Sequence, residues 1–489
     1  METIQIKTVD PLSQELLKSA FHRGLSLSWD RWERLQPQDG FLRLGLSCPY
    51  GCWHGPCRID PFGRGPEKGL CGLDRDQMVA ASFLRLILLG SLAALSQIDQ
   101  LGGNGGGKNF PKILGQAEKK LRGEKISRND LNNSIYYLAR SAESAETIIN
   151  QAIRLALFTL SLLWQKEMLA KRLKPLPLLA GYGLLAQREI NVGVSGYPSL
   201  KLLKTTAEEI KKSCAEKGQL ISLGEIIILN EKCLPCVGTS GETELILSSG
   251  KIDLLIAGPK IDPAVRELCH FLSIPIINSE DRASLKETIK KIKDKKNNNR
   301  PVNFNPPPDL VEEAEVFMGP LGLKELWRKS PSAKIFFLGG DDHLGQPLGW
   351  IPTEVAPNLI DGKTRVFLWG DAGLWMVKKG MLNPQKKLPF HLLEKQSTIL
   401  AALSVLAEGK KINTVGGIFF TGFKNCSDLT FSLGLAALGL KVGVAAPLPV
   451  WGSELVRSFL QKRIGELGGS FTHYDHFAQP EEIIDWFKK

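Results

Sequence analysis

The feature that most restricts what this chain can fold into is a group of four cysteines near its N-terminus. Cys48, Cys52, Cys57 and Cys71 are separated by three, four and thirteen residues. We expect no secretory signal, because residues 1–20 lack a basic segment followed by an apolar core. In a reducing cytosol, cysteines crowded in this way favour metal binding over disulfides.

The spacing of these cysteines favours a four-iron cluster over a single zinc ion. Four thiolates satisfy either group. A cluster is larger, so it needs thiolates from several directions and a backbone that wraps closely around it, which glycine permits. Glycines that permit this close wrapping include Gly51, Gly55, Gly69 and Gly72. A zinc ribbon more often has paired Cys-x2-Cys motifs. His54 lies inside the loop, but Cys57 beside it is the better ligand.

The pattern of apolar residues predicts the α/β fold class. Residues 1–185 have helical patterns and contain the iron–sulfur loop at 45–72. From Ile190 onward, short β-branched runs such as INVGVSG and IDLLIAG alternate with helical stretches, which is typical of parallel sheets with crossover helices. We therefore expect a first Rossmann-like domain at 186–290, a linker and connecting helix at 291–330, and a second Rossmann-like domain at 331–489.

Charge and hydropathy restrict the partners of the chain. Its formal net charge is +11, and the densest basic run, Lys286 to Arg300, lacks interleaved aromatic residues. We therefore expect no nucleic-acid binding, whereas a positive surface suits an acidic electron-transfer partner. The longest apolar run, Val79 to Leu95, contains Arg85 and is shorter than the roughly 20 residues of a membrane span. We interpret it as a buried helix, and we expect a cytoplasmic protein.

A second pair of cysteines, Cys233 and Cys236, forms a Cys-x2-Cys motif. It could be half of a metal site, a redox dithiol or a structural pair. A relocated site could add Cys214, Cys269 or His270, although a core cysteine beside a partly exposed histidine is the simpler interpretation of the last two.

Two further groups of polar residues are candidates. Asp341, Asp342 and His343 follow a buried strand at the end where α/β sheets bind ligands, so hard-metal or acid–base use competes with a simple turn. His473 and His476 could bind a surface metal, but this spacing is common by chance. No strand is followed by a G-x-G-x-x-G motif, so a dinucleotide site is unsupported.

The cysteine loop resembles that of a known family. The sequence GPCRI at 55–59, then LCG at 70–72, then Asp76 and Arg85 are similar to the N-terminal region of the anaerobic nickel–iron carbon monoxide dehydrogenases. The resemblance implies a [4Fe-4S] cluster that relays electrons. Weaker similarity continues over most of the chain, at 191–200, 244–258, 365–384 and 421–440.

The chain departs from this family at its clusters. The family has adjacent cysteines in Cys-Cys-x-x-Cys, whereas here three residues separate Cys48 from Cys52. The resemblance places Asp39 and Ser47 where the family has the thiols of a cluster shared across its dimer axis. We therefore expect no bridging cluster, although a homodimer remains compatible with the sequence.

The ligands of the family's nickel–iron centre are largely missing. By resemblance, Ser195-Gly196-Tyr197 replaces a His-Gly-His segment, and Gly370-Asp371-Ala372 replaces a Gly-Cys-Ala turn. The family's Cys-Cys-Thr-Gly turn corresponds to the region of Gly224-Glu225, where this chain has no cysteine, and another of the family's ligands falls near Pro259-Lys260. Cys426 is shifted by several positions from the family's last ligand. Nickel is therefore not expected.

These observations favour an iron–sulfur protein that transfers electrons in anaerobic one-carbon or redox metabolism, together with a redox partner protein or an enzyme subunit. One alternative is an oxidoreductase of the carbon monoxide dehydrogenase (acceptor) type with a remodelled metal site in the interdomain cleft. Its candidate residues are Cys233, Cys236, Cys426 and His343. A non-catalytic assembly or scaffold subunit is the other alternative. Whether the chain is an enzyme is left open by the sequence.

Overall fold

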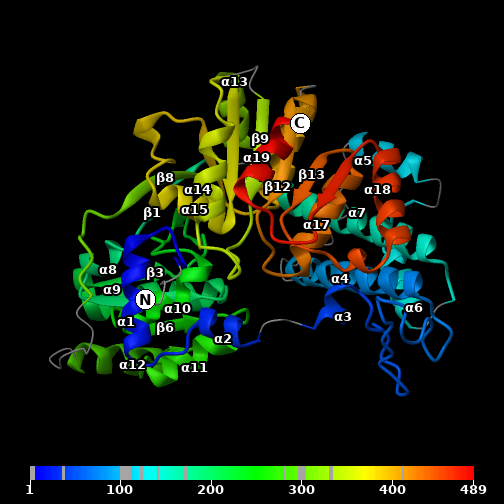
Figure 1. Cartoon of the computed structure of the whole chain (residues 1–489). Coiled ribbons are helices and arrows are strands. Elements are labelled where there is room, and N and C mark those ends of the chain that lie inside the picture. The colour runs from blue at the N-terminus through cyan, green and yellow to red at the C-terminus, as the bar shows by residue number, and fades with distance from the viewer. Residues whose placement is uncertain are drawn as a thin grey trace.

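The computed structural model describes residues 6–35, 39–99, 112–121, 125–139, 142–169, 174–278, 281–295, 304–329, 334–409 and 412–489. Two β-sheets flanked by helices form its centre (Figure 1). The helices are α1 (Pro11–His22), α2 (Ser28–Leu35), α3 (Gly40–Arg43), α4 (Arg75–Asp99), α5 (Lys112–Lys120), α6 (Asn129–Leu138), α7 (Ala145–Leu169), α8 (Leu184–Gln187), α9 (Leu200–Cys214), α10 (Thr243–Ser248), α11 (Pro263–Phe271), α12 (Arg282–Lys295), α13 (Gly319–Lys329), α14 (Trp350–Val355), α15 (Gly370–Lys378), α16 (Thr398–Glu408), α17 (Cys426–Ala437), α18 (Glu454–Leu467) and α19 (Pro480–Lys488).

The larger sheet has the strand order of a doubly wound α/β fold. In spatial order its strands are β1 (Leu176–Ala180), β8 (Glu312–Phe317), β11 (Phe390–Leu393), β10 (Thr364–Trp369), β9 (Lys334–Gly339), β12 (Val415–Phe420), β13 (Lys441–Val444) and β14 (Ser470–His473). Only β1 is antiparallel to its neighbour. Counted from β9, the last six strands follow the order 3-2-1-4-5-6, so the order reverses between β9 and β12. Ligands of such sheets bind at this reversal.

The smaller sheet is parallel and has four strands. Its spatial order is β3 (Gly218–Ser222), β2 (Ile190–Ser195), β6 (Leu254–Ala257) and β7 (Ile276–Ile277). Strand β6 is buried at every residue, as expected for a parallel strand covered by helices on both faces. A short hairpin, β4 (Ile228–Leu229) and β5 (Lys232–Cys233), precedes α10. The expected fold class, a helical N-terminal part followed by two Rossmann-like α/β domains, is confirmed.

The segment around Cys236 joins the two sheets. The backbone N–H of Cys236 donates to Leu179 O at 2.9 Å, and its carbonyl accepts from Gly181 N at 3.0 Å. On the other side, Ser222 N donates to Pro235 O at 2.8 Å. This segment therefore lies as a shared element between the end of β1 and the end of β3.

Helices α4 and α7 form the core of the helical part and pack on α17 of the second α/β domain. A Cβ at Gly90 would lie 2.2 Å from Thr430 Oγ1 and 2.3 Å from Cys426 O, so α4 and α17 approach closely only because this residue has no side chain. Two helical segments have the length and hydropathy of a membrane span, Arg75–Ser96 and Ala145–Met168, but 67% and 72% of their apolar windows are buried. They pack as core helices, in line with the interpretation of Val79 to Leu95.

The predicted division of the chain at residues 185, 290 and 330 stays an interpretation. Helix α1 lies on α10 of the first α/β domain, whereas α4 packs on the second. The stretch assigned to a linker and connecting helix contains α13 and also strand β8. Part of that stretch, 296–303, lies outside the described residues.

Candidate iron–sulfur loop and interdomain cleft

The cysteine loop lies between α3 and α4 and is folded back on itself. Cys48 N donates to Cys57 O at 2.8 Å, which brings the first and third cysteines side by side. Cys52 N donates to Tyr50 O at 2.8 Å, and Gly55 N donates to Cys52 O at 3.1 Å, so two tight turns carry Cys52. Backbone hydrogen bonds within the loop therefore position these three sulfurs.

A second turn brings the chain next to the fourth cysteine back toward Cys57. Leu70 N donates to Cys57 Sγ at 3.4 Å, and Gly69 N donates to Leu73 O at 2.8 Å. Gly72 has φ +87°, a conformation that favours glycine, directly after Cys71. The thirteen-residue gap in the spacing is thus closed by a return of the chain toward Cys57.

The four thiols are close enough to affect one another. Burial raises the pKa of Cys48, and negative charge on Cys57, Cys71 and Cys52 raises it further. Thiolates that destabilise each other in this way are stabilised by a shared cation, and a set of four soft sulfur donors fits an iron–sulfur cluster. Among the described residues, no three His, Cys, Asp or Glu side chains converge on a single metal-ion position. His54 is exposed.

The two α/β domains meet where their strands end, and aspartates hold the contact. Asp371, at the start of α15, is almost fully buried and accepts from Ser240 N at 2.8 Å, Ser240 Oγ at 2.6 Å and Asp342 N at 3.0 Å. Both of its oxygens are therefore occupied by protein donors.

Asp342 is held in the same contact. It accepts from Thr239 Oγ1 at 2.6 Å and from the indole N–H of Trp375 at 2.8 Å. Thr239 begins a capping box with Glu242, which fixes the short 3-10 turn Ser240–Glu242 against the second domain. Asp342 thus works as a structural acceptor between distant segments, whereas the turn interpretation of this segment expected a local role.

A buried ion pair lies behind this turn. Lys378 Nζ contacts Glu242 Oε1 at 2.6 Å and Oε2 at 2.8 Å, and it lies 4.2 Å from the centre of the Trp375 ring. The Glu242 side chain is 0% exposed and that of Lys378 is 6% exposed. Ser13 of α1 also donates to Glu242, so the N-terminal helix is part of the same contact.

A carboxylate occupies the ligand end of the smaller sheet. Glu225 accepts from Gly196 N at 3.1 Å and from Tyr197 N at 3.4 Å, directly after β2. Burial raises the pKa of Glu225, and nearby Lys424 opposes that shift. Partial burial lowers the pKa of Lys424, but Asp341, Asp371 and Glu225 outweigh it and the net shift is upward. The facing strand ends therefore form a polar network in which Lys424 lies near three carboxylates, those of Asp341, Asp371 and Glu225.

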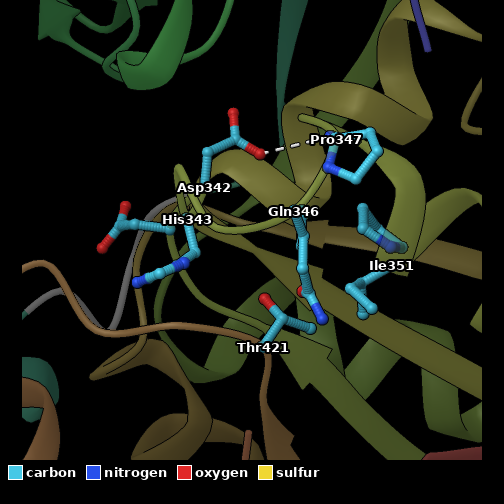
Figure 2. Close-up of a pocket in the computed structure, with 10 residues that line it drawn as sticks. Asp342, His343, Gln346, Pro347, Ile351 and Thr421 are labelled. Carbon is cyan, nitrogen blue, oxygen red and sulfur yellow. Dashed lines mark hydrogen bonds between the residues drawn. The ribbon is translucent and has the colours of Figure 1, made fainter. Parts of the chain in front are cut away.

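A small pocket of about 20 Å³ lies at the point where the strand order of the larger sheet reverses. Its lining comprises Asp341, Asp342, His343, Gln346, Pro347, Gly349, Ile351, Pro352, Ala372 and Thr421. Figure 2 shows Gln346 extending toward Thr421. The His343 ring lies 3.6 Å from the Phe477 ring, and its Nδ1 accepts from Gly345 N at 2.9 Å. Burial lowers the pKa of His343 to about 4, so this ring is neutral at pH 7. Burial and the charge of Asp371 raise the pKa of Asp341.

Comparison with known proteins connects these features to one fold. No family model matches the chain. Over 86 residues of its N-terminal part it is 49% identical to carbon monoxide dehydrogenase 1 of Carboxydothermus hydrogenoformans, and over 87 residues it is 48% identical to carbon monoxide dehydrogenase 1 of Methanosarcina mazei. The matched segment is 18% of this chain and 13% to 14% of those relatives.

The solved structures extend the likeness to the whole chain. Carbon monoxide dehydrogenase IV of Carboxydothermus hydrogenoformans superposes with a TM-score of 0.78 at 18% identity, covering 99% of both chains. A nickel-free carbon monoxide dehydrogenase of Thermococcus sp. AM4 gives 0.77 at 19% identity and covers 99% of this chain and 98% of its own. Its N-terminal part is related to the carbon monoxide dehydrogenases, and the whole chain has their fold. The resemblance predicted from the cysteine loop is thereby confirmed.

The cysteines outside the loop do not gather into one site of this carbon monoxide dehydrogenase fold. Cys214, Cys236 and Cys269 lie in three different hydrophobic clusters. Burial raises the pKa of Cys233 and of Cys236 to about 12, which opposes thiolate reactivity. A second site at Cys233 and Cys236 stays a prediction. The structural role of this segment is to join the two sheets.

The histidines near the C-terminus do not face one another. His473 is buried beside Trp451, with ring centres 5.4 Å apart, whereas His476 is exposed and contacts Asp475 and Glu482. The sequence analysis did not anticipate the Glu242–Lys378 pair. The Thr-Ser-Gly-Glu capping box was visible in the sequence, but its partner across the interface was not.

Proposed function

We propose that this chain is an iron–sulfur protein of carbon monoxide dehydrogenase fold that transfers electrons in anaerobic one-carbon or redox metabolism, without the family's nickel–iron centre. It would act in the cytoplasm with a redox partner protein or an enzyme subunit, and a homodimer is compatible with this role. The observation that carries the proposal is that one folded loop holds all four cysteines, with the backbone of Cys48 bonded to that of Cys57 and the N–H of Leu70, next to Cys71, bonded to Cys57 Sγ.

The loop offers what a [4Fe-4S] cluster requires. A cluster held there would accept and release one electron. The backbone of this chain would hold Cys48 beside Cys57, and the N–H of Leu70 would remain aimed at Cys57 Sγ, where it stabilises negative charge on the sulfur. Zinc in the same loop is the alternative that the donor set leaves open.

The interdomain contact supports the absence of nickel. Asp371, which by resemblance replaces a cysteine ligand of the family, has its oxygens occupied by Ser240 and Asp342. Glu225 is likewise occupied by the backbone after β2. Soft thiolate ligands are absent from these two positions, and the polar groups that replace them satisfy one another.

The deciding experiment is anaerobic purification followed by iron, sulfide, nickel and zinc analysis and a redox titration. We expect about four irons and four sulfides per chain, no stoichiometric nickel, and a reversible one-electron signal. Cys57→Ser should abolish bound iron, whereas the matched variant Cys426→Ser, outside the loop, should keep it. One zinc per chain without iron would refute the proposal.

The pocket beside β9 favours one second candidate, an oxidoreductase with a remodelled active site that includes carbon monoxide dehydrogenase activity. Asp341 and His343 line this pocket at the end where parallel sheets bind ligands. The assay is carbon monoxide oxidation with a dye acceptor. Turnover that disappears in Asp341→Asn, or iron clearly above four per chain that falls in Cys426→Ser, would make this function the first choice. A scaffold role instead predicts that Cys57→Ser unfolds the loop without changing any turnover.

A further inference from the structure

One side of the first α/β domain, formed by α9 and α12, carries a dense set of positive charges. The two helices lie side by side, since Arg282 contacts Glu208 at 3.3 Å and Lys293 Nζ donates to Ser213 O at 3.0 Å. Their apolar side chains pack inward on the smaller sheet, among them Leu203, Ile210, Leu285 and Ile289. We call the outer surface of residues 200–217 and 281–293 the basic face.

A count of every charged residue on the basic face gives a clear positive excess. Ten residues are basic: Lys201, Lys204, Lys211, Lys212, Lys217, Arg282, Lys286, Lys290, Lys291 and Lys293. Five are acidic: Glu208, Glu209, Glu216, Asp281 and Glu287. The β4–β5 hairpin that borders α9 adds one charge of each sign, Glu231 and Lys232. These 31 residues therefore carry a net charge of +5, whereas all 489 residues together carry +11.

The positive charge is confined to one side of this domain. Helices α10 and α11 belong to a different hydrophobic cluster from α9 and α12, as expected for the opposite face of the sheet. They contain one arginine, Arg266, and two glutamates, Glu244 and Glu267. The basic face is therefore a local feature of α9 and α12.

Several lysines of the basic face are available to an external anion. Five of them have exposed side chains and form no ion pair within the described part of the chain: Lys204, Lys211, Lys212, Lys286 and Lys290. Residues four or seven positions apart lie on one side of a helix, so Lys204 and Lys211 align along α9, and Lys286 and Lys290 align along α12. Parallel rows of like charge create a positive potential that attracts anions.

The types of side chain indicate the kind of partner. Nine of the ten basic residues are lysines, and the two segments contain no aromatic residue. Protein interfaces are enriched in Tyr, Trp and Arg and are poor in Lys. Nucleic-acid surfaces commonly add arginines that read bases or aromatic rings that stack on them. Clusters of roughly four to eight Lys or Arg residues bind anionic lipid headgroups without either device.

The shape and position of the basic face also suit a lipid surface. Helix α9 has 15 residues and α12 has 14, so each is roughly 20 Å long at 1.5 Å per residue. Figure 1 shows both helices on the side of the molecule away from α4 and α6. A bilayer under this face would leave the cysteine loop, which precedes α4, uncovered. Because the apolar side chains point inward, binding there would be electrostatic and sensitive to salt.

We propose that the basic face binds the surface of an anionic lipid bilayer and holds the chain there as a peripheral protein. The occupant is a layer of negatively charged headgroups, such as those of phosphatidylglycerol. Such binding requires neither the iron–sulfur cluster nor its redox chemistry, so it succeeds or fails separately from the proposed function.

The test is flotation of the full-length chain with lipid vesicles at low and high salt. One set of vesicles is pure phosphatidylcholine, and the other has equal parts of phosphatidylcholine and phosphatidylglycerol. The face variant combines Lys204→Glu, Lys211→Glu, Lys286→Glu and Lys290→Glu. A second variant with Gln at the same four positions removes the charges without adding new ones, and it serves if the Glu variant does not fold.

The second α/β domain offers a matched control. Four exposed lysines there, changed together to Glu, alter the net charge of the chain by the same amount: Lys363, Lys386, Lys387 and Lys462. Circular dichroism and urea unfolding of every variant confirm that it is folded. The comparison isolates the position of the charges, because the total charge is equal in the face variant and the control.

We expect the original chain to bind vesicles that contain phosphatidylglycerol about tenfold or more tightly than pure phosphatidylcholine, and to be released at high salt. The face variant should bind the anionic vesicles at least about tenfold more weakly, with the control within about twofold of the original chain, because distant charges are screened.

Three results would overturn the proposal. One is the absence of binding to anionic vesicles at low salt. Another is an equal loss in the face variant and the control, which would mean that only net charge matters. The third is duplex DNA that displaces the chain from the vesicles and that the face variant no longer binds, which would assign the basic face to nucleic acid.

Discussion

Removing the positive charge of Lys378 should destabilise the interface between the two α/β domains. Its partner Glu242 is 0% exposed and contacts Lys378 Nζ at 2.6 Å, so Lys378→Met leaves a carboxylate in a place that water does not reach. Loss of one partner from a buried pair costs about 3–5 kcal/mol. Ser13 and Thr239 still donate to Glu242, so we expect the lower end of this range, about 3 kcal/mol.

The chain offers a matched control for this prediction. Lys291 and Glu287 contact each other at the same distance, 2.6 Å, but both side chains are about two-thirds exposed, at 68% and 66%. Lys291→Met should therefore change the free energy of unfolding far less than Lys378→Met does, because solvent screens the exposed pair. The comparison isolates burial, because the distance and the substitution are the same in both pairs.

The assay is anaerobic urea unfolding, with hydrogen exchange of α10 and α15 to locate the change. The double variant Lys378→Met with Glu242→Gln should recover part of the loss, because no unpaired charge remains. A cost for Lys378→Met no larger than that for Lys291→Met would refute the reasoning. A double variant as unstable as the sum of the single variants would refute it as well.

Three further predictions follow from other parts of the structure. Gly90→Ala should separate α4 from α17 and lower the free energy of unfolding by about 1–3 kcal/mol. Gly465→Ala in α18, where a Cβ would have open space, should instead raise the free energy of unfolding by about 0.5–1 kcal/mol. Urea unfolding measures both variants, and equal effects would contradict the close approach of α4 and α17. Asp371→Ala should cost about 1–3 kcal/mol and increase hydrogen exchange of the turn at 240–242, because Ser240 loses its acceptor; unchanged exchange there would show that Asp371 does not hold the turn. Burial lowers the pKa of His473 from 6.5 to about 4. Between these pH values the folded chain keeps the ring neutral while the unfolded chain protonates it. The free energy of unfolding is therefore at its full value above pH 6.5 and falls by about 3 kcal/mol as the pH falls toward about 4. His473→Phe should flatten the unfolding free energy over this pH range, and a profile identical to that of the original chain would contradict the assignment.

Local patterns in the sequence determined the loop and the types of most elements. The cysteine spacing depends on turns of a few residues, so it indicated a metal-binding loop without knowledge of the rest of the fold. The change of apolar period at Ile190 marked the start of the α/β part, because a strand and a helix bury different repeats. The apolar run at 79–95 was correctly assigned to a buried helix, although the full helix α4 is long enough to span a membrane, and its packing on α7 and α17 buries it.

Only the tertiary structure decided what the polar residues at the strand ends do. Asp342 was a candidate ligand in the sequence, and by resemblance Asp371 replaces a cysteine ligand, but their oxygens accept from Ser240, Thr239 and Trp375. These donors come from segments more than a hundred residues away or from another element, so no local pattern reveals them. Strand β8 was missed although Glu313, Ala314, Glu315 and Val316 alternate between exposed and buried positions as a half-buried strand does, because the stretch was assigned to a linker. Residues near in sequence settle loops and helices, whereas contacts between distant segments settle whether a carboxylate supports the fold or faces a ligand.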